Sequence, residues 1–392
     1  MRIKKQDIKS NLYYIIISLF VIYNMIFVLS TIGDKIVLSA NFRTVLISIL
    51  IFGLLIIIFN TRYTIKEFVR ICILLLTSLF VTLFTYDDTI LLFCLFCVAI
   101  KDISMEDVFR KTFFVELILT IVIIFLALVG EIDNKFTVGF SIWDYRIYLG
   151  YKHPNFCGTI FVNLILLLYI IREGNFKFRE YIFSVVLMII DFVGPKSKTM
   201  LIITSALIGI TLIQKFVPTK MYKKLIELSK YLPLVVMAAT LVMVLNYHHN
   251  EDVFVSLNDF LSTRLEQTSY YFNKYDITLF GQPIEQVTYL QVFRAEDVHT
   301  LDNGYMYLLL GKGLLFTVMY ICMAVMCIKR LMRQKMNYLV IVMSLILLWG
   351  FMETYMFRIE MCIPSLLFGI ALFNNVFGNQ DKSYMCNGNQ IR

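Results

Sequence analysis

The feature that most constrains this chain is a series of apolar runs that are bounded by charged residues. A helix of about 20 residues crosses the roughly 30 Å of hydrocarbon in a bilayer, and it satisfies its own backbone hydrogen bonds there. Most of the runs are about this long. The mean hydropathy of +0.75 and the charged fraction of 16% also fall outside the range of soluble domains. The sequence therefore predicts an all-α polytopic membrane protein.

Twelve candidate spans follow from the boundaries of these runs, and they make residues 1–392 a single integral membrane domain. The spans are 11–31, 44–60, 69–85, 88–100, 112–130, 155–172, 181–193, 198–216, 231–247, 305–328, 337–356 and 360–378. Two of them, 88–100 and 181–193, are short enough to be tilted or re-entrant, so counts of ten or eleven stay open. The first run is too long for a signal-peptide core and has no small-residue cleavage site after it, so we expect it to be a span of the mature chain.

Lys and Arg residues cluster between the spans, and the clusters alternate between the two sides of the membrane. With the N-terminus in the cytoplasm, 24 of the 36 Lys and Arg residues fall on the inner side. Cytoplasmic loops carry such an excess, so the pattern predicts that both termini are cytoplasmic. The longest polar stretch, 248–302, then becomes a large outer loop, and its aromatic residues favour a folded lid. The net charge of +8 is a topology signal, because no basic face interleaved with aromatics indicates nucleic-acid binding.

Several cations lie on the outer side, where the positive-inside pattern disfavours them. They are Arg146, Lys152, Lys196, Lys198, Arg264 and Arg294, and the same outer clusters contain His153, Asn303 and Tyr305. A planar guanidinium matches two phosphate oxygens and an ammonium adds a point charge, so these residues together suit a lipid-linked pyrophosphate without a metal. The alternative is that each cation is an ordinary solvated or snorkelling loop charge.

Three outer groups are candidates for a general base: Asp302, His299 and His153. Asp302 precedes Asn-Gly at the predicted start of a span, so a plain helix-cap or turn role is its alternative. The histidines lack the i, i+4 spacing that indicates a metal site, and we expect neither a metal nor a cofactor. No phosphate-loop, dinucleotide-binding or nucleophile-elbow motif competes with this interpretation.

Four short motifs resemble, in their order and shared outer position, those of the Wzy-type oligosaccharide repeat-unit polymerases, within the superfamily of O-antigen polymerases and ligases. They are RIYLGYKHPN from Arg146 to Asn155, PKSKT from Pro195 to Thr199, LSTR from Leu261 to Arg264 with LFG from Leu279 to Gly281, and LDNGY from Leu301 to Tyr305 with GKG from Gly311 to Gly313. Two departures stand out. Thr263 replaces glycine before Arg264, and lysine replaces arginine within PKSKT, which would remove a bidentate contact.

The resemblance implies a glycosyltransferase of the bacterial cytoplasmic membrane that joins undecaprenyl-pyrophosphate-linked oligosaccharide units on the outer face, for capsule, exopolysaccharide or O-antigen. It implies that Arg146 and Arg264 bind the donor pyrophosphate and that Lys196 or Lys198 replaces a family arginine. An acceptor hydroxyl would attack the anomeric carbon, and Asp302 or His299 would take its proton. Membrane lipids, a flippase and chain-length regulator proteins are the further partners that it implies.

Three other functions are compatible with the sequence: a polysaccharide flippase or other secondary transporter, an O-antigen ligase, and a non-catalytic membrane scaffold. A transporter predicts charges in the middle of spans and paired broken helices. The polarity of this chain gathers instead in one outer loop, which favours an outer-face enzyme. The ligases have a histidine where this chain has Asp302, which favours a polymerase.

Overall fold

The fold is helical throughout the part of the chain that the computed structural model describes. That part comprises residues 2–36, 39, 41–137, 145–214, 216, 218–247, 252–287 and 299–373. Within these ranges the only sheet pairs β1 (Phe136–Thr137) with β2 (Arg146–Ile147) in antiparallel fashion. Seven helical segments are long and apolar enough to cross a membrane, which confirms the prediction of an all-α, multi-pass membrane protein.

The helices follow the predicted spans in order. The seven long segments are α1 (Arg2–Tyr23) with the π-helix η1 (Asn24–Leu29), α3 (Phe42–Phe59), α4 (Ile65–Thr85), α6 (Met105–Leu128), α7 (Pro154–Ile171), α10 (Thr219–Leu228) with α11 (Leu232–Leu245), and α14 (Gly304–Tyr307) with η4 (Leu308–Lys312) and α15 (Gly313–Arg333). Shorter helices are α5 (Thr89–Ala99), α8 (Phe178–Val193), α9 (Lys198–Ile213) and α16 (Asn337–Trp349). Each predicted span up to 337–356 therefore contains a helix.

The chain departs from regular α-helix in its last two predicted spans. α16 ends at Trp349, and two 3₁₀ helices follow, η5 (Thr354–Phe357) and η6 (Ile363–Ala371). Gly350 permits the break, because a Cβ there would lie 2.1 Å from the sulfur of Met356. Every residue of η6 is buried, so its irregular backbone is shielded from lipid. Residues 374–378 lie outside the described residues, and the count of twelve spans stays a prediction.

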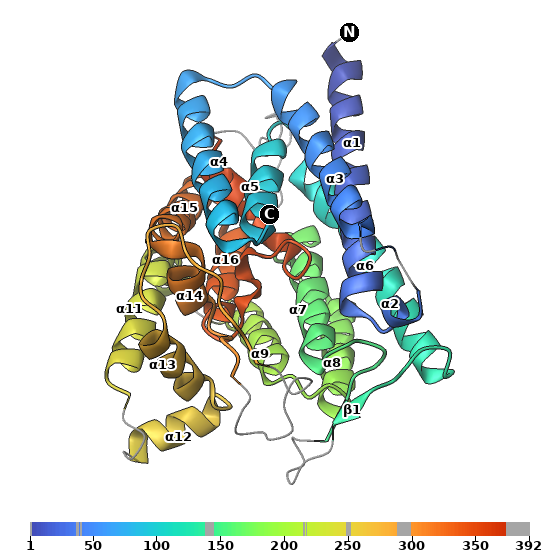
Figure 1. Cartoon of the computed structure of the whole chain (residues 1–392), viewed down its shortest axis with the longest axis vertical. Coiled ribbons are helices and arrows are strands. Elements are labelled where there is room, and N and C mark those ends of the chain that lie inside the picture. The colour runs from blue at the N-terminus through green and yellow to red at the C-terminus, as the bar shows by residue number, and fades with distance from the viewer. Residues whose placement is uncertain are drawn as a thin grey trace, which may run out of the picture.

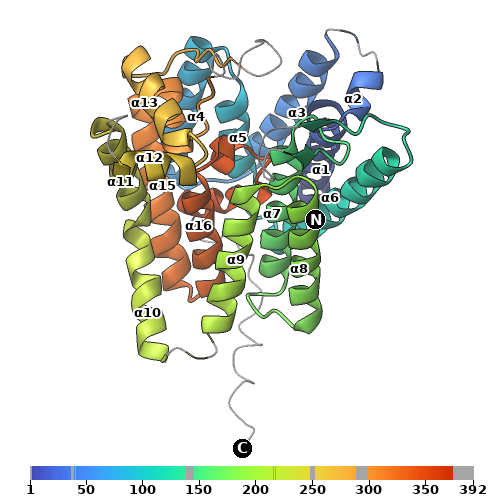
Figure 2. The ribbon, with the colours of Figure 1, turned by 90° about the horizontal axis from the view of Figure 1, so that it is seen from below.

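Polar contacts gather at two opposite ends of the bundle. Figure 1 shows β1, α12 (Asp252–Phe260) and α13 (Arg264–Lys274) in the half of the molecule far from the N-terminus, which we call the loop end, and Figure 2 shows α2 (Ile32–Lys35) on the same side as α12 and α13. Figure 2 shows α10 at the opposite side of the molecule from α12 and α13. Near the N-terminus, Lys101 forms an ion pair with Glu67 at 2.6 Å and donates to the carbonyl of Arg62 at 2.7 Å. Loops predicted to share a side of the membrane thus contact one another.

The described part of the long loop is folded onto the helices. The backbone N–H of Leu314, at the start of α15, donates to the carbonyl of Thr278 at 2.9 Å. The ring of Phe280 stacks on that of Phe84 in α4, with 5.5 Å between the ring centres. Backbone hydrogen bonds and aromatic packing therefore hold residues 276–287 against α4 and α15.

Gly281→Ala is expected to loosen this docked loop. A Cβ at position 281 would lie 2.3 Å from the carbonyl oxygen of Gly311, and φ is +87°. Gly130 is the matched control, because its φ is +81° but a Cβ there would meet nothing within 4 Å. Thermal unfolding in detergent should show that Gly281→Ala loses about 1–3 kcal/mol more stability than Gly130→Ala. Equal losses would contradict the close backbone contact.

Candidate functional site

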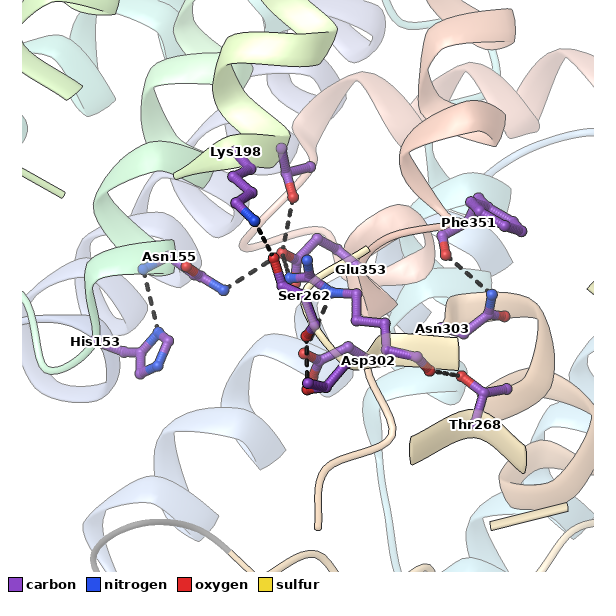
Figure 3. A network of polar contacts seen from close by, with 12 residues as sticks. His153, Asn155, Lys198, Ser262, Thr268, Asp302, Asn303, Phe351 and Glu353 are labelled. Carbon is purple, nitrogen blue, oxygen red and sulfur yellow. Dashed lines mark hydrogen bonds and ion pairs between the residues drawn. The ribbon is translucent and has the colours of Figure 1, made fainter. Parts of the chain in front are cut away.

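Charged side chains from three segments that are distant in the sequence meet at the loop end (Figure 3). Arg264 begins α13, Asp302 lies shortly before α14, and Glu353 follows the end of α16. Nη2 of Arg264 lies 2.7 Å from Oε1 of Glu353, and its Nε lies 3.5 Å from Oδ2 of Asp302. One ion pair therefore ties α13 to the helix break after α16, and the other ties α13 to the segment before α14. We call these groups and their partners the charged cluster.

Glu353 is the centre of the charged cluster. The residue is only 3% exposed, and its Oε1 accepts hydrogen bonds from Arg264 at 2.7 Å, the hydroxyl of Thr199 at 3.1 Å and the amide of Asn155 at 3.4 Å. Burial of an unpaired carboxylate is strongly unfavourable, and these donors offset that cost. No described residue donates a hydrogen bond to Oε2. This second oxygen therefore has capacity to accept a further hydrogen bond.

Arg264 is itself largely buried, with 13% of its side chain exposed. Burial opposes its positive charge, but the negative charges of Glu353 and Asp302 outweigh burial and raise the pKa of the guanidinium. Its Nε is buried and has no hydrogen-bond partner among the described residues, because its approach to Asp302 is an ion pair without hydrogen-bond geometry. An oxygen of a ligand would satisfy this donor.

Arg146 reaches the charged cluster from β2. Its Nε donates to the carbonyl of Pro195 at 2.6 Å, and its Nη2 donates to the side-chain oxygen of Asn155. Both partners are neutral. Burial lowers the pKa of the guanidinium, although the charge of Asp191 opposes this shift. Within the described ranges Arg146 has no direct ion pair with a carboxylate, so its charge suits the binding of an anion.

The short turn between α8 and α9 is built around the buried Asp191. The backbone N–H of Ser197 donates to Oδ2 of Asp191 at 3.0 Å. Gly158 of α7 allows the turn to come close, because a Cβ at that position would lie 2.4 Å from the Cβ of Ser197. The turn thereby positions the carbonyl of Pro195, which accepts from Arg146, and the hydroxyl of Thr199, which donates to Glu353.

The lysines of this turn, predicted to bind the substrate, lie at the edge of the charged cluster. Nζ of Lys198 donates to the hydroxyl of Ser262 at 2.8 Å. The ammonium of Lys196 lies 5.5 Å from the ring centre of Tyr145. Arg294, the remaining predicted loop cation, lies outside the described residues.

Lys152 and His153 support the segment that precedes α7. Lys152 forms an ion pair with Asp34 at 2.9 Å, which ties the segment to α2. Nδ1 of His153 accepts a hydrogen bond from the backbone of Asn155 at 3.1 Å and so caps α7. Although His153 is exposed, desolvation by the surrounding protein and the charges of the two site arginines lower its pKa to about 4. The ring is therefore neutral near pH 7, as an accepting cap requires.

Three further residues that the sequence predicts for the site, Asn303, Tyr305 and His299, make structural contacts near the charged cluster. Asn303 caps α14 with its side-chain oxygen, and its amide donates to the carbonyl of Phe351 at 2.9 Å. Tyr305 is fully buried and donates to the backbone of α16 at 2.9 Å. The ring of His299 stacks on Tyr270, with 4.2 Å between the ring centres. No hydrogen bond or ion pair joins these three side chains to Glu353 or Arg264 among the described residues.

Glu353 and Thr199 were not among the site residues that the sequence predicts. Glu353 carried a usable signal, since it is a carboxylate within the predicted span 337–356, and ionisable groups in spans mark functional sites. Thr199 lies in the PKSKT motif, but the motif did not single it out from the lysines beside it, because threonine is common near the start of a helix. The hydrogen bond between Thr199 and Glu353 becomes evident only in the folded structure, where α9 lies next to the break after α16.

The charged cluster offers two guanidiniums, one buried carboxylate and one carboxylate that is 36% exposed. Such groups can bind an anion, orient a hydroxyl group and accept a proton. Within the described ranges, no three His, Cys, Asp or Glu side chains are grouped as metal ligands would be.

The pair Arg264–Glu353 is expected to contribute far more to stability than an exposed ion pair does. Removal of one partner leaves a buried charge, which costs about 3–5 kcal/mol. We therefore expect a double-mutant cycle of Arg264→Gln and Glu353→Gln to show a coupling of about 1–3 kcal/mol in thermal unfolding. The control is the exposed pair Arg110–Glu106, at 2.6 Å, whose coupling should stay near 0.5 kcal/mol. Equal coupling energies in the two cycles would show that burial does not strengthen the pair Arg264–Glu353.

Comparison with known proteins gives no match. No protein-family model matches the sequence, no curated protein matches it, and no solved structure matches the fold.

Proposed function

We propose that this protein is a polymerase that joins lipid-diphosphate-linked oligosaccharide units on the outer face of a bacterial cytoplasmic membrane. The observation that carries the proposal is that Arg264 pairs directly with the buried Glu353, while Arg146 is linked to the same carboxylate through Asn155. The segments that contribute these arginines, with the turn at 195–199 and Asp302, are those in which the sequence resembles the Wzy-type polymerases. The loop end is the outer face in this proposal, with twelve spans and both termini in the cytoplasm.

The two arginines would bind the diphosphate of the donor. Arg146 has only neutral partners, and the Nε of Arg264 has no hydrogen-bond partner among the described residues, so both have binding capacity for phosphate oxygens. Lys198, at the edge of the charged cluster, would add a point charge by exchanging its hydrogen bond to Ser262 for a phosphate. The donor would thus be held by its diphosphate, with its sugar next to Glu353.

Glu353 is the general base in this proposal. A hydroxyl group of the acceptor sugar attacks the anomeric carbon of the donor, the bond from that carbon to the phosphate oxygen breaks, and undecaprenyl pyrophosphate leaves. The hydroxyl proton passes to Oε2 of Glu353, which no described residue occupies. The arginines stabilise the negative charge that develops on the leaving group. Asp302 orients Arg264 through their ion pair, whereas His299 contacts neither arginine among the described residues.

Complementation of a polymerase-null producing strain tests this function. Wild type should restore long polysaccharide chains on a gel, whereas Arg264→Ala, Asp302→Ala and Glu353→Gln, at matched membrane expression, should leave single lipid-linked units on the outer face. Arg110→Ala is the matched control, because this exposed arginine of α6 lies away from the charged cluster, and it should behave as wild type.

The same experiment separates the alternative functions. If single units accumulate on the inner face without the protein and wild type moves them outward, the protein is a flippase and the proposal is wrong. If chain length does not depend on the protein but transfer of finished chains to a lipid core does, it is a ligase.

Substitution of lysine for each arginine gives a quantitative prediction. Lysine keeps the charge but loses the planar fork that binds two phosphate oxygens. We expect Arg146→Lys and Arg264→Lys to lower the rate of chain extension by roughly 10²–10³-fold, as the loss of one donor at a transition-state oxyanion does. The rate is measured with lipid-linked units in membranes. If both variants stay within about twofold of wild type, the arginines do not bind the diphosphate as proposed.

A further inference from the structure

A second polar cavity lies between α1, α3, α5 and the chain that joins η5 to η6. The empty space in it and at its open mouth, solvent included, amounts to about 490 Å³. Charged and amide side chains line it, namely Asn24, Arg43, Asp88, Arg358 and Glu360. None of these residues belongs to the charged cluster around Glu353, so the proposed chemistry leaves the cavity unexplained. Packing of α1 against α3 and of α3 against α5 forms its walls (Figure 1).

The polar groups of this cavity form two ion pairs. Arg43 lies 2.9 Å from Asp88, and Arg358 lies 2.9 Å from Glu360. Nε of Arg358 donates a hydrogen bond to Glu360, whereas the terminal nitrogens of Arg358 donate to no described residue. Glu360 is 7% exposed and Asn24 is 8% exposed, so both are held inside the protein next to the empty space. Asn24 donates to the carbonyl of Phe20 at 2.9 Å and Glu360 accepts from Arg358. The side-chain oxygen of Asn24 and the terminal nitrogens of Arg358 keep capacity for a bound ligand.

The backbone is irregular where it meets the cavity. Asn24 begins the π-helix η1, and Arg358 and Glu360 lie between two 3₁₀ helices. π-Helical turns are rare and occur frequently at functional sites. Irregular backbone at membrane depth is tolerated where it lines a polar cavity. Both irregular segments face the same space, which supports a binding site over a packing defect.

The chemistry of the lining fits a neutral sugar. Each guanidinium already faces a carboxylate, so an anion would meet as much negative as positive charge. Sugar hydroxyl groups both donate and accept, and the lining offers donors from arginine and asparagine beside acceptors from the two carboxylates. Tyr23 and Phe20 also line the cavity, and the little aromatic surface that they expose is suited to the C–H face of a sugar ring.

The cavity lies close to the charged cluster along the chain. Glu353 and Arg358 flank the two ends of η5, and a 3₁₀ helix rises about 2 Å per residue, so their backbones are roughly 10 Å apart. We infer that this cavity binds a neutral sugar residue of an oligosaccharide. That this oligosaccharide is the acceptor of the transfer at Glu353 rests on the function proposed above.

Binding of a free oligosaccharide tests the inference. The probe is the repeat-unit oligosaccharide, released from its lipid by mild acid, and saturation-transfer NMR measures its binding to the full chain in detergent. We expect binding by wild type, and at least a tenfold loss of affinity in Asn24→Leu and in Val28→Phe, which fills the cavity and keeps every charge. Val45→Phe, on the exposed face of α3, is the matched control and should bind as wild type. Each variant must keep the unfolding temperature of wild type.

Failure of this inference and failure of the proposed function give different results. If the cavity variants bind the oligosaccharide as wild type does, or if wild type does not bind it, the sugar site is refuted. Farnesyl pyrophosphate probes the charged cluster separately, and Arg264→Ala should weaken its binding without a change in oligosaccharide binding. If farnesyl pyrophosphate does not bind although the oligosaccharide binds through the cavity, the proposed function fails and the sugar site stands.

Discussion

The ion pair between Arg264 and Glu353 is the contact on which the arrangement of the loop end depends. A buried carboxylate is stable only with strong donors, and Glu353 obtains them from α13, α9 and α7 at once. These three elements are thereby fixed to the chain break after α16. One buried charge thus orders segments that lie far apart in the sequence, and all three of its donors share one carboxylate oxygen.

Irregular backbone accompanies polarity throughout this protein. The π-helix η1 and the chain between η5 and η6 line the cavity, the latter with the ion pair Arg358–Glu360, and the break before η5 carries Glu353. In a membrane protein such backbone must be buried in protein or face a polar space, because lipid satisfies no hydrogen bonds. In the proposed function, binding and chemistry lie at these polar departures from regular helix, and the regular helices serve as the scaffold.

The sequence predicts the helices well and the charged cluster only in part. Apolar length and flanking charge determine where helices such as α3 and α7 lie, so those spans could be predicted without a structure. Arg264 and Asp302 could be nominated because they are charged and lie on the side that the sequence predicts to be the outer one. The roles of Lys152 and Tyr305 could not, since an ion pair to Asp34 and burial against α16 depend on tertiary contacts.

The central claim is that sugar transfer at the charged cluster releases the lipid diphosphate of the donor. The most direct measurement places the purified chain in lipid nanodiscs with its lipid-linked repeat unit and quantifies undecaprenyl pyrophosphate and extended chains together. The account predicts that one molecule of undecaprenyl pyrophosphate appears for each new glycosidic bond and that both products disappear in Glu353→Gln. Undecaprenyl pyrophosphate without new bonds, or new bonds at wild-type rate in Glu353→Gln, would contradict it.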